Sequence, residues 1–207
     1  MGRRIFNIPV LLFIPLALLL IVIVAGVYRF SLNDDEIMDK FSSSQSADPV
    51  VEAIFGLKVP NVLVIPVPET HANAVFSEFN FEHQIALASF DSGKERGTVV
   101  MQRHPQVTTD LKLGQGFVSV ISVSNQGSGS FNYLVSLGLD RQRTRLVAVD
   151  HYFLGDRVLI TNLQNEVDHI SIIYFEHGVN QAMSDDPSQK VEKQLVVNDL
   201  GKFIEKE

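Results

Sequence analysis

The sequence predicts a β-rich α+β domain, mainly an antiparallel sheet of meander type with short N-terminal helices, preceded by one transmembrane helix. Three observations lead to this fold class. The 207 residues suffice for one ordinary domain with appendages. The second half of the chain is a series of strand-like segments, and their connections are too short for parallel crossovers. The first thirty residues contain a long apolar segment without charge.

The composition excludes several classes of protein. Hydrophobic residues make up 45% of the chain and charged residues 20%, which excludes disorder over most of its length. With 17 basic and 24 acidic residues the formal net charge is −7, so the basic patch of a nucleic-acid-binding protein is not expected. Because there is no cysteine, disulfides, thiolate zinc sites and cysteine nucleophiles are excluded as well.

The N-terminal segment predicts a membrane anchor. Residues 5–28 carry no charge and would span about 36 Å as a helix, against roughly 30 Å of bilayer hydrocarbon. Arg3 and Arg4 precede this segment, and the acidic run Asp34–Glu36 follows it. By the positive-inside rule, residues 1–4 are cytoplasmic and the chain after the helix is periplasmic, in a single-pass protein of the bacterial inner membrane.

An alternative to the anchor is a cleaved signal peptide. Val24-Ala25-Gly26 is a passable cleavage site, but the apolar segment is longer than a usual signal core, which favours a retained helix. The chain beyond the helix has a net charge of about −10, because Arg3, Arg4 and Arg29 are the basic residues left behind. Anionic headgroups repel such a domain, so we expect only the helix to contact lipid.

Residues 29–47 read as a linker, in which Asn33 caps a short helix over residues 34–41 and a serine-rich run follows. The periplasmic domain is then residues 48–207. Asp48 is a predicted N-cap for a helix over residues 49–55, and Gly56 ends that helix.

The rest of the domain is predicted to be strands. Strand patterns cover residues 61–67, 85–90, 97–101, 117–123, 131–137, 146–154, 157–163, 169–175 and 190–197. In the fourth of these, Phe117, Ile121 and Val123 alternate with Val118 and Val120, which puts an apolar set on each face. Gly155-Asp156 predicts a two-residue hairpin turn. Residues 170–175 are apolar on both faces and are expected to form a central strand.

From about Gly114 to Val197 the chain resembles an uncharacterised β-rich domain of bacterial lipoproteins and envelope proteins. Three blocks carry the resemblance: Gly127-Ser-Gly-Ser-Phe-Asn-Tyr-Leu134, Leu154-Gly-Asp-Arg-Val158 and His177-Gly-Val-Asn-Gln-Ala-Met183. The resemblance implies a fold and an extracytoplasmic location, and it implies no activity.

The residues that could carry chemistry have simpler interpretations. The Gly-Ser-Gly loop lacks the lysine and helix of a phosphate-binding loop, and a structural turn is favoured. Asp156 and Arg157 are expected to hold a turn through internal bonds. Glu176, His177, Asp185 and Asp186 could bind a hard cation, although a solvated acidic loop is the favoured interpretation. No catalytic residue and no cofactor is predicted.

The leading hypothesis is a non-catalytic binding or accessory domain of the cell envelope, with the inner membrane and an envelope protein as partners. The alternatives are an envelope hydrolase or metal-dependent enzyme, and an anchor that assembles with other helices. Met183, Asp185 and Asp186 in the loop from Gly178 to Gln189 are the candidate binding residues. In the competing interpretation the loop is a plain connector with Met183 in the core.

Overall fold

The computed structural model describes residues 10–31, 46–103, 107–112 and 114–206, which fall into two compact units that divide after Ser46. The first unit contributes one helix, α1 (Val10–Ser31), and the side chains described in it, residues 14–27, are exposed except at Gly26. Within the described part of the chain, no helix combines the length and apolar character needed to cross a membrane. The transmembrane helix therefore stays a prediction from the sequence. The helix predicted over residues 34–41 lies outside the described residues.

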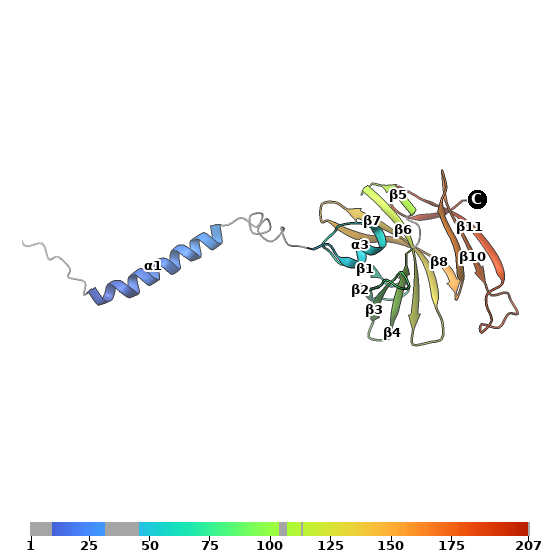
Figure 1. Ribbon diagram of the computed structural model, residues 1–207, viewed down its shortest axis with the longest axis horizontal. Helices are drawn as coiled ribbons and strands as arrows, with labels where there is room; N and C mark the ends of the chain where they lie inside the picture. Colours follow the sequence, from blue (N-terminus) through green and yellow to red (C-terminus); the bar gives the residue numbers. More distant parts are fainter. Residues whose placement is uncertain (1–9, 32–45, 104–106, 113, 207) are drawn as a thin grey trace, which may run out of the picture. The chain divides into compact units, whose positions relative to one another are not determined.

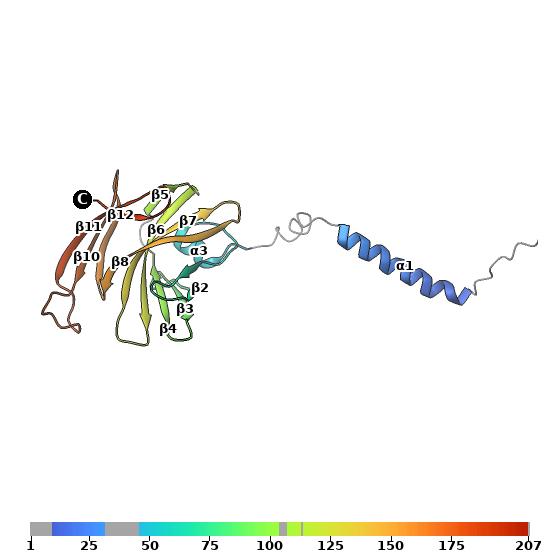
Figure 2. The ribbon, with the colours of Figure 1, turned by 180° about the vertical axis from the view of Figure 1, so that it is seen from behind.

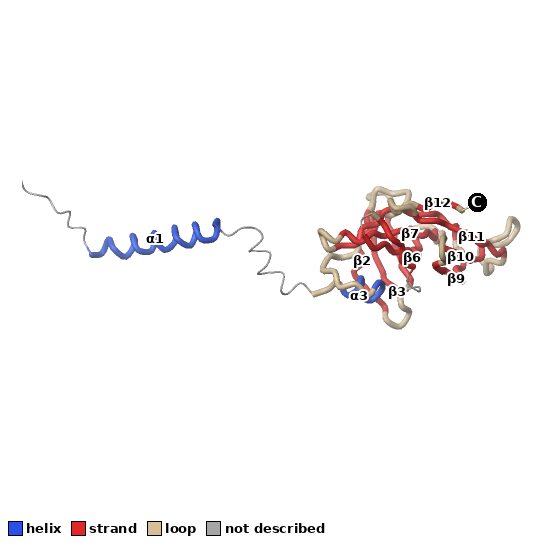
Figure 3. The backbone as a smooth tube through the Cα atoms, turned by 90° about the horizontal axis from the view of Figure 1, so that it is seen from above, coloured by secondary structure: helices blue, strands red, loops and turns tan. Residues whose placement is uncertain are grey.

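The second unit is β-rich and contains two antiparallel sheets (Figures 1 and 3). Sheet A consists, in spatial order, of β1 (Val64–Pro66), β2 (Asn73–Asn80), β3 (Ile85–Asp91), β4 (Arg96–Gln102), β6 (Gly114–Asn125), β7 (Phe131–Asp140) and β8 (Arg145–Asp156), with β5 (Val107–Leu111) paired to β6. Sheet B consists of β12 (Phe203–Glu205), β11 (Gln189–Val197), β10 (Ile170–Glu176) and β9 (Leu159–Asn165). The predicted β-rich, antiparallel architecture is confirmed.

Sheet A curls into an almost closed barrel. β1 returns to contact β8 without pairing with it. Proline cannot donate to a strand ladder, and Pro66 lies in β1 with Pro68 just beyond it. A cavity of about 60 Å³ remains at this seam, lined by both prolines and by Val149, Asp150 and His151.

The helix at the start of the domain forms as predicted. In α3 (Pro49–Phe55), the Asp48 carboxylate accepts hydrogen bonds from the backbone N–H groups of Val50 and Val51, at 3.0 and 2.9 Å. Gly56 ends the helix in the left-handed conformation, with φ of 67°. The ring of Phe55 lies 5.4 Å from that of Phe117 on β6, so the helix packs into the interior of the curled sheet.

The central strands supply two separate hydrophobic cores. On β6, Phe117, Ile121 and Val123 point into the first core, inside the curled sheet A. Val118 and Val120 point the other way, into a second core that lies between sheets A and B. The predicted alternation is confirmed, and it explains why a second sheet is needed: an apolar outer face must be covered.

Polar bonds tie sheet B to sheet A near the end of the chain, where β12 lies beside β11 (Figure 2). The buried hydroxyl of Ser136 on β7 donates to the carbonyl of Gly201, and Asp150 on β8 accepts from the N–H of Phe203 at 2.9 Å. The hydroxyl of Tyr152 donates to Glu205, which Lys193 also contacts at 3.1 Å. Burial raises the pKa of Tyr152, and its bond to Glu205 raises that pKa further.

Two strand predictions are corrected by the structure. The predicted turn at Gly155-Asp156 is wrong, because β8 continues through Asp156 and the chain turns at Arg157-Val158. Within the described residues β8 and β9 do not pair, and the chain changes sheets between them. The N–H of Arg157 donates to Ser130 O at 2.7 Å, which holds the end of β8 against β7 in place of β9.

Three strands were not predicted, namely β2, β5 and β12. β2 carries a register shift between Phe76 and Glu78, which breaks the alternation that a sequence pattern relies on. β5 and β12 are only five and three residues long, too short for a pattern. The first predicted strand was too long: the pattern covered residues 61–67, whereas β1 pairs with β2 over only three residues.

Replacement of Ile172 by Asp is expected to unfold the domain. Ile172 is fully buried on β10, which lies between β9 and β11, and its side chain points into the second core. An unpaired charge there costs several kcal/mol, on the order of the whole stability. The matched control is Ile173→Asp, because Ile173 is only half-buried on the other face of the same strand. Circular dichroism melting compares the two variants; a folded Ile172→Asp protein beside an unfolded Ile173→Asp protein would reverse the assignment of faces.

The turn before β10 contains an acid-sensitive contact. Asp168 lies 2.6 Å from Nδ1 of His169 and 2.5 Å from Nζ of Lys206. The hydrogen bond from Lys206, followed by that from His169, lowers the pKa of Asp168 from 3.8 to about 2. A carboxyl with a lowered pKa contributes stability above its unfolded pKa and loses that contribution as the pH falls through the folded value.

We therefore expect Asp168→Asn to lose the part of the acid dependence of stability that falls between about pH 4 and pH 2. Urea titrations at several pH values measure this dependence. Asp185→Asn is the control, because Asp185 is exposed and forms no ion pair among the described residues. Equal pH profiles for the protein and its Asp168→Asn variant would contradict the expectation.

Candidate functional site

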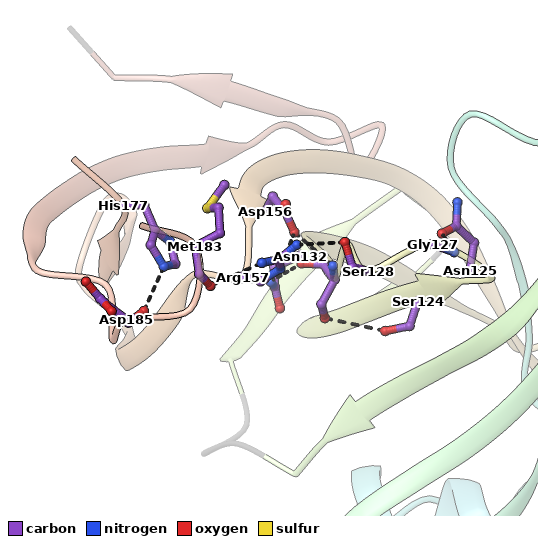
Figure 4. Close-up of polar contacts among 11 residues, drawn as sticks. Ser124, Asn125, Gly127, Ser128, Asn132, Asp156, Arg157, His177, Met183 and Asp185 are labelled. Atoms are coloured by element: carbon purple, nitrogen blue, oxygen red, sulfur yellow. Dashed lines mark hydrogen bonds and ion pairs between the residues drawn. The ribbon is translucent and has the colours of Figure 1, made fainter. Parts of the chain in front are cut away.

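Three loops that are far apart in the sequence meet around Arg157 (Figure 4). They are the turn from Asn125 to Ser130, the sheet-changing connection at residues 155–158, and the loop at residues 177–188. Nη1 of Arg157 donates to Met183 O at 3.1 Å, and Nη2 donates to Ser128 Oγ at 3.3 Å. One guanidinium therefore bridges the other two loops.

Local backbone geometry holds Arg157 in place. Its φ is 50°, a left-handed conformation that is uncommon for a residue with a side chain. Asp156 Oδ1 accepts from the N–H of Ser130 at 2.8 Å and lies 3.7 Å from Nε of Arg157. Gly155 precedes them with φ of 147°, and a Cβ there would lie 2.8 Å from Val158. The expectation that Asp156 and Arg157 make internal bonds is confirmed.

The loop at residues 177–188 is held by its own polar groups. Gln181 accepts from the N–H of Gly178 at 3.1 Å and from Ser188 Oγ at 2.9 Å, and it donates to Asp186 O. His177 Nε2 lies 2.9 Å from Asp185 O. These bonds use main-chain atoms of the two aspartates, and the carboxylate of Asp185 accepts from the neighbouring Ser184 Oγ at 3.4 Å.

The candidate residues Met183, Asp185 and Asp186 all lie at the surface of this loop. Met183 is 46% exposed, so the prediction that its side chain lies in the core is wrong, while the choice between a binding loop and a connector stays a prediction. Among the described residues neither aspartate forms an ion pair, and no group of three or more histidine or acidic residues is arranged to hold a metal ion.

A cleft of about 420 Å³ opens beside Arg157, at the corner where the edge of sheet B meets the outer face of sheet A. Such a volume is within the range of ligand sites. Sheet B contributes the start of β9, and sheet A contributes polar side chains of β4, β6 and β7. The lining residues are Gln102, Val120, Ser122, Ser130, Asn132, Arg157, Val158, Leu159, Ile160, Asp186 and Pro187.

The floor of the cleft is pre-organised. Asn132 is 5% exposed; it accepts from Ser122 Oγ at 2.5 Å and donates to Ser130 O at 2.9 Å. Sequence patterns gave no signal for Gln102, Ser122 or Asn132, because each looks like an ordinary strand residue. Only the pairing of β4, β6 and β7 brings them together.

The remaining histidines are dispersed. His151 packs against the ring of Tyr133 at 5.9 Å, whereas the neighbouring Asp150 accepts from the N–H of Phe203, so the two side chains point to opposite faces of β8. His71 and His83 are exposed, and His104 lies outside the described residues.

Comparison with family models, curated proteins and solved structures found no match for this chain.

Arg157→Lys is expected to loosen the loop at residues 177–188. Two different guanidinium nitrogens reach Met183 O and Ser128 Oγ, whereas a lysine has a single nitrogen and lacks this planar fork, so we expect at least one of the two bonds to be lost. Loss of these bonds lowers the free energy of unfolding by about 1–3 kcal/mol and speeds amide hydrogen exchange in residues 177–188.

The control for Arg157→Lys is Arg143→Lys, since the Arg143 side chain is 72% exposed and only approaches Asp140, at 3.7 Å. Urea unfolding and hydrogen exchange with mass spectrometry measure both variants. Equal exchange in residues 177–188 for the two variants would show that Arg157 does not hold the loop.

Proposed function

We propose that this chain is a single-pass protein of the bacterial inner membrane whose periplasmic domain is a non-catalytic binding or accessory module of the cell envelope. The corner cleft and the adjoining loop at residues 177–188 form its binding surface. Met183, Asp185 and Asp186 lie on the rim of this surface.

The proposed anchor is supported by the sequence of α1. Leu18–Val24 are seven consecutive apolar residues of α1, and seven positions cover every face of a helix. A helix that is apolar all round needs an apolar environment. Arg3 and Arg4 before it give the orientation.

The observation that supports the binding role is that polar side chains beside the cleft hold the neighbouring loops in place through hydrogen bonds. Arg157, Asp156 and Asn132 each bond to main-chain or hydroxyl groups of neighbouring loops. Such bonds hold a surface in one shape, and a surface shaped in advance loses little entropy when it binds. Met183 adds an adaptable apolar contact at the rim, and the exposed carboxylates of Asp185 and Asp186 add charge.

A photo-crosslinking residue at position 183 tests this proposal in the bacterium that makes the full chain. The substitution keeps the main-chain carbonyl that Arg157 contacts. We expect a discrete adduct in the membrane fraction, reduced about tenfold by Asp185→Ala with Asp186→Ala. The melting temperature should stay the same, since exposed charges contribute little to stability.

Val167 is the control position for the crosslinker, because it is fully exposed at the turn between β9 and β10. Deletion of residues 1–30 should move the protein from the membrane pellet to the supernatant. A full chain found in the supernatant would refute the anchor. Equal adducts at positions 183 and 167 would refute the binding surface.

A further inference from the structure

We propose that the corner cleft binds a short, extended peptide segment without acidic side chains, which adds to the free edge of β9 as a further strand of sheet B. The inference rests on the proposed binding function and names the class of ligand. It starts from the two edges of sheet B, which differ in how they are protected.

An exposed strand edge presents unpaired N–H and C=O groups, and folded proteins usually protect it with charges, prolines or short length. The β12 edge of sheet B has such protection: it is three residues long, and Lys202 and Lys206 flank it. The β9 edge has seven residues without a charge or a proline, but its pairing with β10 is irregular at Thr161, and such a bulge also protects an edge. Only β10 pairs with it among the described strands. The stretch of β9 before Thr161 is therefore the part open to strand addition.

Only the first part of β9 is free to accept a strand. At its far end, Asn165 donates to Thr108 O of β5 at 2.9 Å, and Val107 of β5 packs into the second core together with Leu163. The cleft lies along Val158, Leu159 and Ile160. At about 3.3 Å per residue, this stretch accommodates roughly three residues of an extended ligand.

The opposite wall of the cleft can satisfy the second edge of such a ligand. Gln102 is exposed and forms no hydrogen bond among the described residues, so its amide is free to donate and accept. The hydroxyl of Ser122 donates to Asn132 and still has capacity to accept. An extended peptide would thus have β9 main chain on one side and small polar side chains on the other.

The charges around the cleft disfavour an acidic segment. The Arg157 guanidinium is opposed by Asp156 at 3.7 Å, and Asp186 lines the same end of the cleft, so negative charge is in excess there. The middle of the cleft is formed by Val120, Leu159 and Ile160, against which apolar ligand side chains can pack.

A second copy of this chain is a poorer fit for the site. Edge-to-edge pairing of two copies of sheet B needs β9 to project freely over its length. Here the outer face of sheet A forms one side of the corner, and β5 already contacts the end of β9. A single extended segment can enter this corner, whereas a second sheet cannot.

A library of seven-residue peptides displayed on phage, panned against the full chain in detergent micelles, provides the probe. The most enriched peptide is synthesised with a fluorescent label and titrated by polarisation. We expect Gln102→Trp to fill the cleft and weaken binding by about tenfold or more. The control is Gln164→Trp, since Gln164 is an exposed glutamine on β9 outside the cleft, and it should change affinity less than about twofold. Both variants should melt as the parent does.

Hydrogen exchange locates the bound peptide independently of these variants. Strand addition predicts slower exchange at Leu159–Thr161 in the complex, because main-chain groups of the edge become paired. Failure to enrich any peptide, equal affinity in both tryptophan variants, or protection confined to other strands would overturn the proposal. If position 183 forms a crosslink but no peptide binds, the proposal of a peptide ligand is refuted and the proposed binding function stands. If position 183 forms no crosslink and no peptide binds, the proposed binding function is refuted as well. Concentration-dependent self-association that Gln102→Trp abolishes would identify a second copy as the occupant instead.

Discussion

Burial of both faces of β6 and β7 is the constraint on which the rest of the structure depends. An antiparallel sheet commonly leaves one face to water, with polar side chains there. Here Phe117 and Ile121 fill one core, while Val120 and Leu134 fill the other. A single packing layer would cover only one of these two apolar faces and leave the other exposed to water. Sheet A therefore curls around the first set with the help of α3, and sheet B covers the second.

The corner cleft is a consequence of this two-layer arrangement. Sheet B has four strands against the eight of sheet A, so its edge ends partway across the outer face. The chain reaches sheet B through the connection at Arg157, whose bonds to Ser128 Oγ and Met183 O gather the neighbouring loops. The residue that completes the crossing between sheets thus also shapes one end of the cleft.

Local signals predicted those elements whose stability is itself local. Asp48 and Gly56 marked both ends of α3, because capping groups bond within their own turn. The apolar alternation on β6 predicted both of its faces. β2 escaped prediction because its bulge between Phe76 and Glu78 breaks the alternation, and the turn at Arg157 was misplaced because a distant partner, Ser130, decides it.

For the candidate site the division is similar. Loop length and polarity were enough to single out Met183, Asp185 and Asp186, and all three are at the surface. The sequence by itself determined the strands other than β2, β5 and β12, and, on β6, which side chains are apolar on each face. Only the tertiary structure decided that β8 and β9 lie in different sheets, and hence where Gln102, Ser122 and Asn132 form a cleft. Strands pair through hydrogen bonds between backbones that are far apart in the sequence. Because every residue offers the same backbone groups, the sequence pattern of one strand does not show which strand it pairs with.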